Sequence, residues 1–172
     1  MATDNQLKIG LDYHGVIDKK TDYFAKFCSE AKARNHLVYI ITGGPKLKVE
    51  EALKKQNIQY DFVFAISDYY QALGKLELTQ DGTINIPEYL WNIAKADFCR
   101  RNNINFHIDD SIAYLHWFST PFCFYDDKVN KCYLSPGIVI DFLQPINDVF
   151  DKIEQISANL TSFSFCKKEN EQ

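Results

Sequence analysis

The stretch KIGLDYHGVI, residues 8–17, decides the fold. It is an apolar run that ends abruptly at Asp12, with His14 and Gly15 close behind. An apolar run that does not alternate with polar residues is typical of a strand covered on both faces of a parallel sheet. Ligands bind such sheets outside the carboxyl ends of the strands, so Asp12 is the first candidate functional residue.

The rest of the chain repeats this unit of a short apolar strand followed by an amphipathic helix. The pattern predicts a three-layer, Rossmann-like α/β fold, with a parallel sheet and helices on both of its faces. The expected strands are 7–12, 36–42, 60–67, 104–109 and 121–126, and the expected helices are 21–35, 45–57, 87–103 and 110–118.

One segment departs from this rhythm and predicts a small insertion at 68–92. Within it, residues 75–86 carry two apolar-rich arms around Asp81-Gly82, a strong signal for a β-hairpin. A short apolar run and a closing helix are expected within 135–160. The sequence therefore predicts one domain over residues 1–166, followed by a frayed tail at 167–172.

Composition excludes several classes of protein. The 172 residues carry a net charge of −4, which disfavours a nonspecific nucleic-acid binder. No apolar run approaches the length of a membrane span, so no membrane partner is expected. The five cysteines lack metal-ligand spacing and predict buried reduced thiols in a cytoplasmic protein. They are Cys28, Cys99, Cys123, Cys132 and Cys166.

Polar groups end three of the expected strands: Asp12, Thr42 followed by Gly43, and Asp109 followed by Asp110. Each has an alternative interpretation as an ordinary turn or helix cap. All three would open onto one edge of the sheet, however, where clustered carboxylates need a hard cation and oxygen ligands suit Mg²⁺. A hydroxyl, glycine amides and a lysine beside that metal would form a receptor for a phosphoryl group, with Asp12 as nucleophile.

These motifs together resemble the haloacid dehalogenase (HAD) superfamily over residues 7 to about 126. IGLDYHGVID is similar to its first motif, VYIITGG to its second and NFHIDDS to its fourth. The resemblance implies that Asp12 is the nucleophile, that Thr42 and Gly43 bind phosphoryl oxygens, and that Asp109 and Asp110 bind magnesium. The third motif of the family is a lysine, for which Lys95, 14 residues before Asp109, is the first choice. Lys75 and Arg100 are the alternatives.

The departure from the family pattern is His14, which stands where the family's phosphatases have a second aspartate. That aspartate acts as general acid and base, two tasks that an imidazole can also perform. The resemblance also implies a magnesium contact through the backbone carbonyl at this position, which His14 retains. His36, His107 and His116 show no ligand spacing to one another, so core or surface roles are preferred for them.

The resemblance implies a Mg²⁺-dependent phosphatase, a hydrolase that cleaves a phosphomonoester through an aspartyl-phosphate on Asp12. A nucleotide or another small phosphoester is the expected substrate. The insertion is too small for a large cap, so the site is open or takes its lid from a partner subunit. The alternatives are a metal- and phosphate-binding protein without turnover and a phosphotransferase. The aromatic-rich stretches DYYQAL and YLW either pack the hairpin or stack on a ring.

Overall fold

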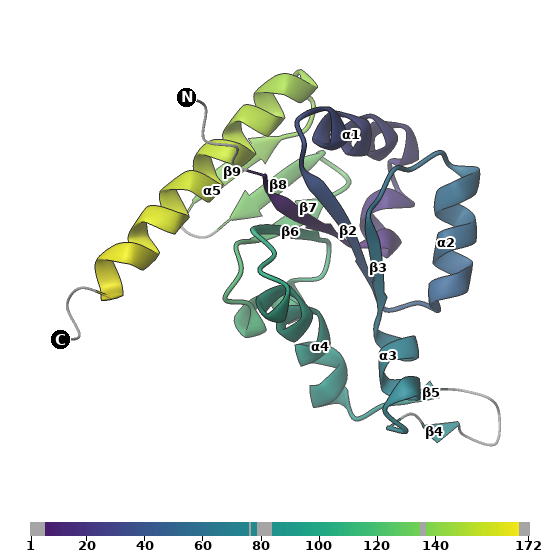
Figure 1. Cartoon of the computed structure of the whole chain (residues 1–172). Coiled ribbons are helices and arrows are strands. Elements are labelled where there is room, and N and C mark those ends of the chain that lie inside the picture. The colour runs from purple at the N-terminus through teal and green to yellow at the C-terminus, as the bar shows by residue number, and fades with distance from the viewer. Residues whose placement is uncertain (1–5, 76, 79–83, 135–136, 169–172) are drawn as a thin grey trace.

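A seven-stranded sheet forms the centre of the protein (Figure 1). The computed structural model describes residues 6–75, 77–78, 84–134 and 137–168. The strand order is β3-β2-β1-β6-β7-β8-β9, in which the first five strands run parallel, β8 pairs antiparallel with β7, and β9 pairs antiparallel with β8. The strands are β1 (Lys8–Leu11), β2 (Leu37–Thr42), β3 (Phe62–Ala65), β6 (Phe106–Asp109), β7 (Phe122–Asp126), β8 (Lys131–Leu134) and β9 (Ile138–Asp141).

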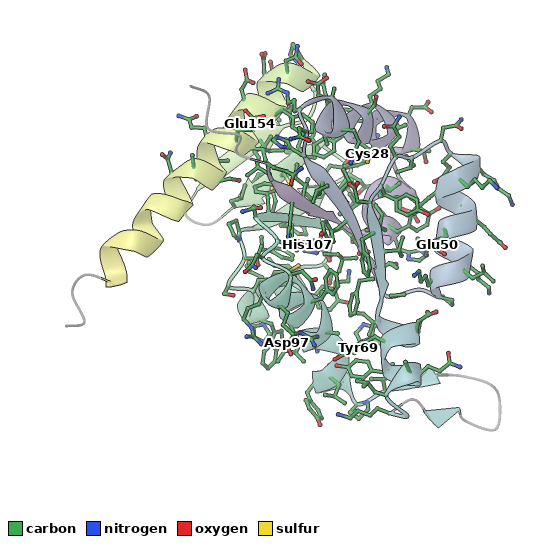
Figure 2. All side chains as sticks on the ribbon, in the orientation of Figure 1. Cys28, Glu50, Tyr69, Asp97, His107 and Glu154 are labelled. Atoms are coloured by element: carbon green, nitrogen blue, oxygen red, sulfur yellow. A yellow bond between two sulfur atoms is a disulfide. The ribbon has the colours of Figure 1, made fainter. Side chains whose placement is uncertain are left out.

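Helices cover both faces of this sheet, which confirms the predicted three-layer α/β fold. Alternate residues of β2 reach two separate cores: Val38 and Ile40 pack with α1, α2 and α5, whereas Ile41 packs with α3 and α4. Figure 2 shows the same division, with Cys28 and Glu50 on one side of the sheet and Tyr69 and Asp97 on the other. The helices are α1 (Thr21–Ala33), α2 (Lys46–Lys55), α3 (Ile66–Ala72), α4 (Glu88–Arg101) and α5 (Ile146–Lys168).

The connections from β1 create a switch point in the middle of the sheet. From β1 the chain moves through α1 to β2 and then through α2 to β3, away from β6. After β3 it crosses the opposite face through α3 and α4 and returns to pair β6 with the other side of β1. The strand order therefore reverses between β1 and β6, and the crevice at their carboxyl ends is where α/β sheets bind ligands.

Asparagines close three of the helices and turn the chain into the next strand. Asn35, Asn57 and Asn103 follow α1, α2 and α4, and each adopts a left-handed backbone conformation with φ between 54° and 64°. Asparagine tolerates this conformation better than other non-glycine residues. An asparagine in the left-handed conformation thus reverses the chain before each of β2, β3 and β6.

Two short segments outside the main sheet follow the expected chain order. The arms of the predicted hairpin are β4 (Glu77–Leu78) and β5 (Ile84–Asn85), which pair antiparallel. Its Asp81-Gly82 turn lies outside the described residues. At the C-terminus, residues 167 and 168 of the predicted tail belong to α5, and residues 169–172 lie outside the described residues.

After β6 the predicted short helix is the 3₁₀ helix η2 (Ile112–Trp117). None of the described helices combines the length and apolar character that a membrane span requires.

The far edge of the sheet differs from the prediction, because β8 was not expected there. β8 begins at Lys131 and exposes Tyr133, so it lacks the continuous apolar character used to identify the other strands. Strand β3 also ends earlier than predicted, because Ile66 and Ser67 already belong to α3.

The expectation of reduced cysteines is wrong for one pair. Cys123 of β7 and Cys132 of β8 form a disulfide, whereas Cys28 and Cys99 are buried free thiols. The sequence did not reveal this pair because only the antiparallel pairing of β7 with the unpredicted β8 makes the two residues neighbours. The prediction of buried reduced thiols is thus confirmed for Cys28 and Cys99 and wrong for Cys123 and Cys132.

The left-handed turn at Asn103 predicts an unusual order of stability among substitutions. Asn103→Ala should lower the free energy of unfolding by about 1 kcal/mol, because alanine is strained in this conformation. Asn103→Gly should be at least as stable as the wild type at this position, because glycine adopts the conformation freely. Urea denaturation of the three proteins measures this order, and an alanine variant as stable as the glycine variant would contradict it.

Candidate active site at the switch point

Asp12 stands at the carboxyl end of β1 in a fixed orientation. Its backbone N–H donates to the carbonyl of Ile108 in β6 at 2.9 Å, which holds the first residue after β1 against the neighbouring strand. One carboxylate oxygen accepts the N–H of Tyr13 at 2.8 Å, and the other lies 2.7 Å from Lys95 Nζ. Only 5% of Asp12 is exposed. The carboxylate is therefore held by backbone and side-chain contacts together.

Lys95 reaches from α4 to the ends of both central strands. Its ammonium lies 2.7 Å from an oxygen of Asp12 and 2.7 Å from an oxygen of Asp109, and its side chain is 2% exposed. Burial would lower the pKa of this ammonium, but the two carboxylates raise it above its usual value. Lys95 is thus a permanent cation that joins β1 to β6 across the switch point.

The two carboxylates on Lys95 have different electrostatic surroundings. Burial alone would raise the pKa of Asp109, but Lys95 and His107 hold it below its usual value, and Ser111 N–H also donates to it at 2.9 Å. Burial raises the pKa of Asp12 to about 7 against the opposing charge of Lys95, and the negative charge of Asp109 raises it further. Asp109 therefore stays ionised, whereas Asp12 gains or loses its proton near neutral pH.

His107 supports Asp109 from the interior of the sheet, a role that the sequence analysis did not assign. Its Nε2 lies 3.2 Å from Asp109, and its ring stacks on Phe118 with an angle of 3° between the rings. Burial lowers the pKa of His107, which favours a neutral ring that donates its Nε2 proton to the carboxylate. Figure 2 labels His107 at the centre of the molecule. Its position two residues before Asp109 on one strand was the available signal, because such residues share a face.

Asp110 completes an acidic cluster that could hold a metal ion. One oxygen each from Asp12, Asp109 and Asp110 lie within 4.8 Å of one another. Burial raises the pKa of Asp110, and Asp109 adds to the effect. The Asp110 carboxylate occupies the space that a side chain at Gly15 would fill, and Gly15 has a φ of 85°. Glycine at position 15 is therefore required both by its backbone conformation and by the carboxylate beside it.

Thr42 and the glycines after β2 lie on the other side of Asp12. The Thr42 hydroxyl accepts the N–H of Gly44 at 3.2 Å and lies 3.2 Å from His14 Nδ1. A side chain on Gly44 would come within 2.7 Å of the His14 ring. His14 belongs to the wide turn η1 (Tyr13–Ile17) and has an extended backbone there, with ψ of 128°. The ring therefore lies over the loop after β2.

Several of these groups line a pocket of about 420 Å³, whereas the fully buried Thr42 and Asp109 lie behind its lining. The residues that it brings together come from the ends of β1, β2 and β6 and from α4 and η2. The alternative candidates for the lysine lie elsewhere: Lys75 is exposed after α3, and exposed Arg100 bonds to Asp97. His36 is a buried partner of Leu7 and Glu154, and His116 is exposed on η2. The pocket is lined by Asp12, His14, Gly43, Gly44, Trp91, Lys95, Asp110, Ser111 and Tyr114.

Comparisons with known proteins give little further information. No protein-family model matches this chain, and no curated protein matches it. A solved glycosyltransferase from Rickettsia africae ESF-5 is weakly similar in structure, with 12% sequence identity and a TM-score of 0.40. The matched region covers 75% of this chain and 31% of that chain, so this chain corresponds to less than a third of the glycosyltransferase. At this level of similarity the glycosyltransferase says nothing about the chemistry of this chain.

The buried position of Lys95 predicts a large effect on stability. Lys95→Met leaves Asp12 and Asp109 buried without their cation, and we expect the free energy of unfolding at pH 8 to fall by about 3 kcal/mol. The double variant Lys95→Met/Asp12→Asn should recover part of this loss, because it removes one of the two unpaired charges. Urea denaturation measures both, and exposed Lys54→Met on α2 is the control.

The loss in Lys95→Met should also shrink as the pH falls from 8 to 5. Without the lysine, the pKa values of the two carboxyl groups are raised in the folded protein relative to the unfolded chain. Carboxyl groups with raised pKa values add to the free energy of unfolding at low pH, where they are protonated, and this contribution is lost as the pH rises through their pKa values in the folded protein. A loss that is equal at both pH values, or no recovery in the double variant, would show that the carboxylates are not charged neighbours.

Proposed function

We propose that this protein is a Mg²⁺-dependent phosphomonoester hydrolase of the HAD type, acting on a small phosphorylated substrate. The observation that carries the proposal is the contact of Lys95 with both Asp12, which lines the pocket at the switch point, and the buried Asp109 behind it. A carboxylate nucleophile, a fixed cation and further carboxylates for a metal are the groups that phosphoryl transfer through an acyl phosphate needs. The order of β2, β1 and β6 also supports the HAD resemblance, because it puts the three motif-bearing strands side by side.

The residues around Asp12 fit a magnesium ion. The donors would be carboxylate oxygens of Asp12, Asp109 and Asp110 together with the backbone carbonyl of His14, an all-oxygen set that suits a hard cation. The raised pKa of Asp12 reflects burial and negative charge that Lys95 only partly offsets, so a second cation is favourable there. When bound, Mg²⁺ neutralises the carboxylates and the phosphoryl oxygens, which otherwise repel one another.

Asp12 would carry the covalent step. Its ionised carboxylate oxygen attacks the phosphorus, the bond from phosphorus to the leaving-group oxygen breaks, and that oxygen takes a proton as it leaves. Water then attacks the phosphorus of the aspartyl-phosphate, gives up a proton, and releases inorganic phosphate and the free Asp12 carboxylate. The Thr42 hydroxyl, the Gly43 N–H and the Lys95 ammonium would hold the phosphoryl oxygens as negative charge builds up on them.

His14 would donate a proton to the leaving group in the first step and take one from the attacking water in the second. The Thr42 hydroxyl lies 3.2 Å from His14 Nδ1 and accepts the Gly44 N–H at 3.2 Å, and its second lone pair can accept the Nδ1 proton of a protonated ring. A protonated His14 ring would therefore donate to Thr42 through Nδ1 and keep a second proton on Nε2. Within the described part of the chain no hydrogen bond occupies Nε2. His14 Nε2 is therefore our candidate for the proton donor to the leaving group.

A phosphate-binding protein without turnover is the second candidate, and the observation that favours it is the same histidine. The His14 ring contacts the Thr42 hydroxyl, the group that would bind the phosphoryl oxygen, and no carboxylate stands at position 14. A phosphotransferase, in which the phosphoryl group passes from Asp12 to an acceptor other than water, is a third form of the same chemistry.

Activity on an aryl and an alkyl phosphate separates these candidates. In the presence of Mg²⁺, Asp12→Asn should abolish turnover of both esters, a loss of at least about a thousandfold, because it removes the nucleophile. His14→Ala should slow the alkyl ester by about a hundredfold or more and the aryl ester less, because an aryl leaving group needs little protonation. Steady-state release of inorganic phosphate measures both effects.

Matched controls make these results specific. Asp97→Asn changes a partly exposed aspartate of α4, and His116→Ala changes an exposed histidine of η2; neither lines the pocket, so neither should alter activity. Turnover that survives Asp12→Asn would contradict the mechanism. No turnover by the wild type, together with a higher melting temperature in phosphate and Mg²⁺, would favour the binding protein.

The pKa of Asp12 predicts that magnesium binding releases a proton. Below pH 7 this carboxyl group is protonated in the metal-free protein, and a metal ligand must be ionised. Mg²⁺ affinity should therefore rise by about tenfold for each pH unit below 7 and level off above it. Calorimetry in two buffers of different ionisation enthalpy should show up to about one proton released at pH 6. Asp12→Asn should abolish the proton release, and Asp97→Asn should retain it.

A further inference from the structure

Two aromatic side chains, Trp91 and Tyr114, line the pocket beside Asp12 and Lys95. We call this pair the aromatic wall. Trp91 comes from α4 and Tyr114 from η2, and the indole N–H of Trp91 donates to the Tyr114 hydroxyl at 3.2 Å. The bond holds the two rings together across elements that lie on either side of β6 in the sequence.

The aromatic wall touches two of the residues proposed to bind the phosphoryl group. A side chain on Gly43 would come within 2.7 Å of Trp91 Cζ2, so the indole lies directly on this glycine. The Lys95 ammonium lies 4.9 Å from the centre of the Tyr114 ring, within the range of a cation–π contact. A ligand whose phosphoryl group reaches Gly43 and Lys95 therefore has its leaving group next to aromatic carbon.

Core packing does not account for both rings. Trp91 packs partly against the second core cluster, but it remains partly exposed and lines the pocket. Tyr114 is also partly exposed and belongs to η2, in which no residue is buried. Aromatic side chains that border a ligand pocket bind planar rings by stacking, with little dependence on the identity of the ring.

We propose that this pocket prefers phosphomonoesters whose leaving group contains a planar aromatic ring, bound against Trp91 and Tyr114. The inference rests on the proposed function for the phosphoryl half of the ligand and adds the chemical class of the other half. A nucleotide and an aryl phosphate both provide such a ring. A sugar or glycerol phosphate does not.

Binding of phosphonates tests the preference without turnover, because their carbon–phosphorus bond is not the bond that a phosphomonoesterase breaks. The chain has two tryptophans, so Trp117→Phe leaves Trp91 as its only indole. In Mg²⁺ we expect phenylphosphonate to quench the fluorescence of Trp91 with saturation. Phenylphosphonate should also bind about ten times more tightly than methylphosphonate, which lacks a ring.

Variants of the wall show whether the rings themselves are responsible. Trp91→Leu should weaken phenylphosphonate about tenfold in calorimetry and leave methylphosphonate unchanged. Trp91→Phe keeps a ring and should retain most of the preference, so a folding defect in the leucine variant would not decide the question. Trp117→Leu removes an indole that does not line the pocket and should change neither affinity.

KM values for three phosphate esters show whether the aromatic ring of the ligand belongs to a nucleotide or to an aryl phosphate. If the ligand is a nucleotide, KM should be lower for adenosine monophosphate than for phenyl phosphate, and the reverse order would indicate an aryl phosphate. Glycerol 3-phosphate should have the highest KM of the three.

Failure of the aromatic preference and failure of the proposed hydrolysis give different results in these experiments. Equal binding of both phosphonates, or no binding of either, would overturn the aromatic preference, and equal binding would leave the phosphatase proposal intact. Tighter binding of phenylphosphonate without any turnover of phosphate esters would support the preference and contradict the proposed hydrolysis.

Discussion

The ammonium of Lys95, held between two buried carboxylates, is the interaction on which the centre of this molecule depends. Three elements meet at this one nitrogen: β1 through Asp12, β6 through Asp109, and α4 through the lysine itself. Buried charges are costly unless they are paired, so this contact fixes how α4 packs on the sheet. It also leaves the cluster with more negative than positive charge. The same contact therefore holds β1, β6 and α4 together and leaves a net negative charge that favours the binding of a further cation.

The two aspartates that contact Lys95 differ in their pKa values because they accept different numbers of hydrogen bonds. Asp109 receives donors from Lys95, His107 and the Ser111 N–H, and these keep its carboxylate ionised and immobile. Asp12 has fewer donors and a pKa near neutrality, which suits a group that must form and break a bond. Two aspartates on neighbouring strands thus have different chemical properties, and the difference comes from the backbone and side chains around them.

The sequence predicted the features that follow from a parallel sheet, namely its apolar strands and the polar residues at their carboxyl ends. Asp12, Thr42 and Asp109 were recognisable because parallel strands end at one edge, and Lys95 because its helix leads into β6. Strand β8 was missed because its buried residues Cys132 and Leu134 alternate with Lys131 and exposed Tyr133, and the disulfide of Cys123 depends on that strand. Periodicity places His107 on the same face as Asp109, but it does not indicate the contact between them. Trp91 and Tyr114 come from different elements, and periodicity along the chain does not show that their side chains meet at the site.

The contact between Gly15 and Asp110 has an evolutionary consequence. Gly15 lies in η1 and Asp110 directly follows β6, and the carboxylate fills the volume that any larger residue at position 15 would need. Substitutions at the two positions are therefore coupled: a homologue that gains a side chain at position 15 must shorten or displace the acid at position 110. Covariation of this pair in related sequences would then trace which lineages keep the metal-binding acid and which have given it up.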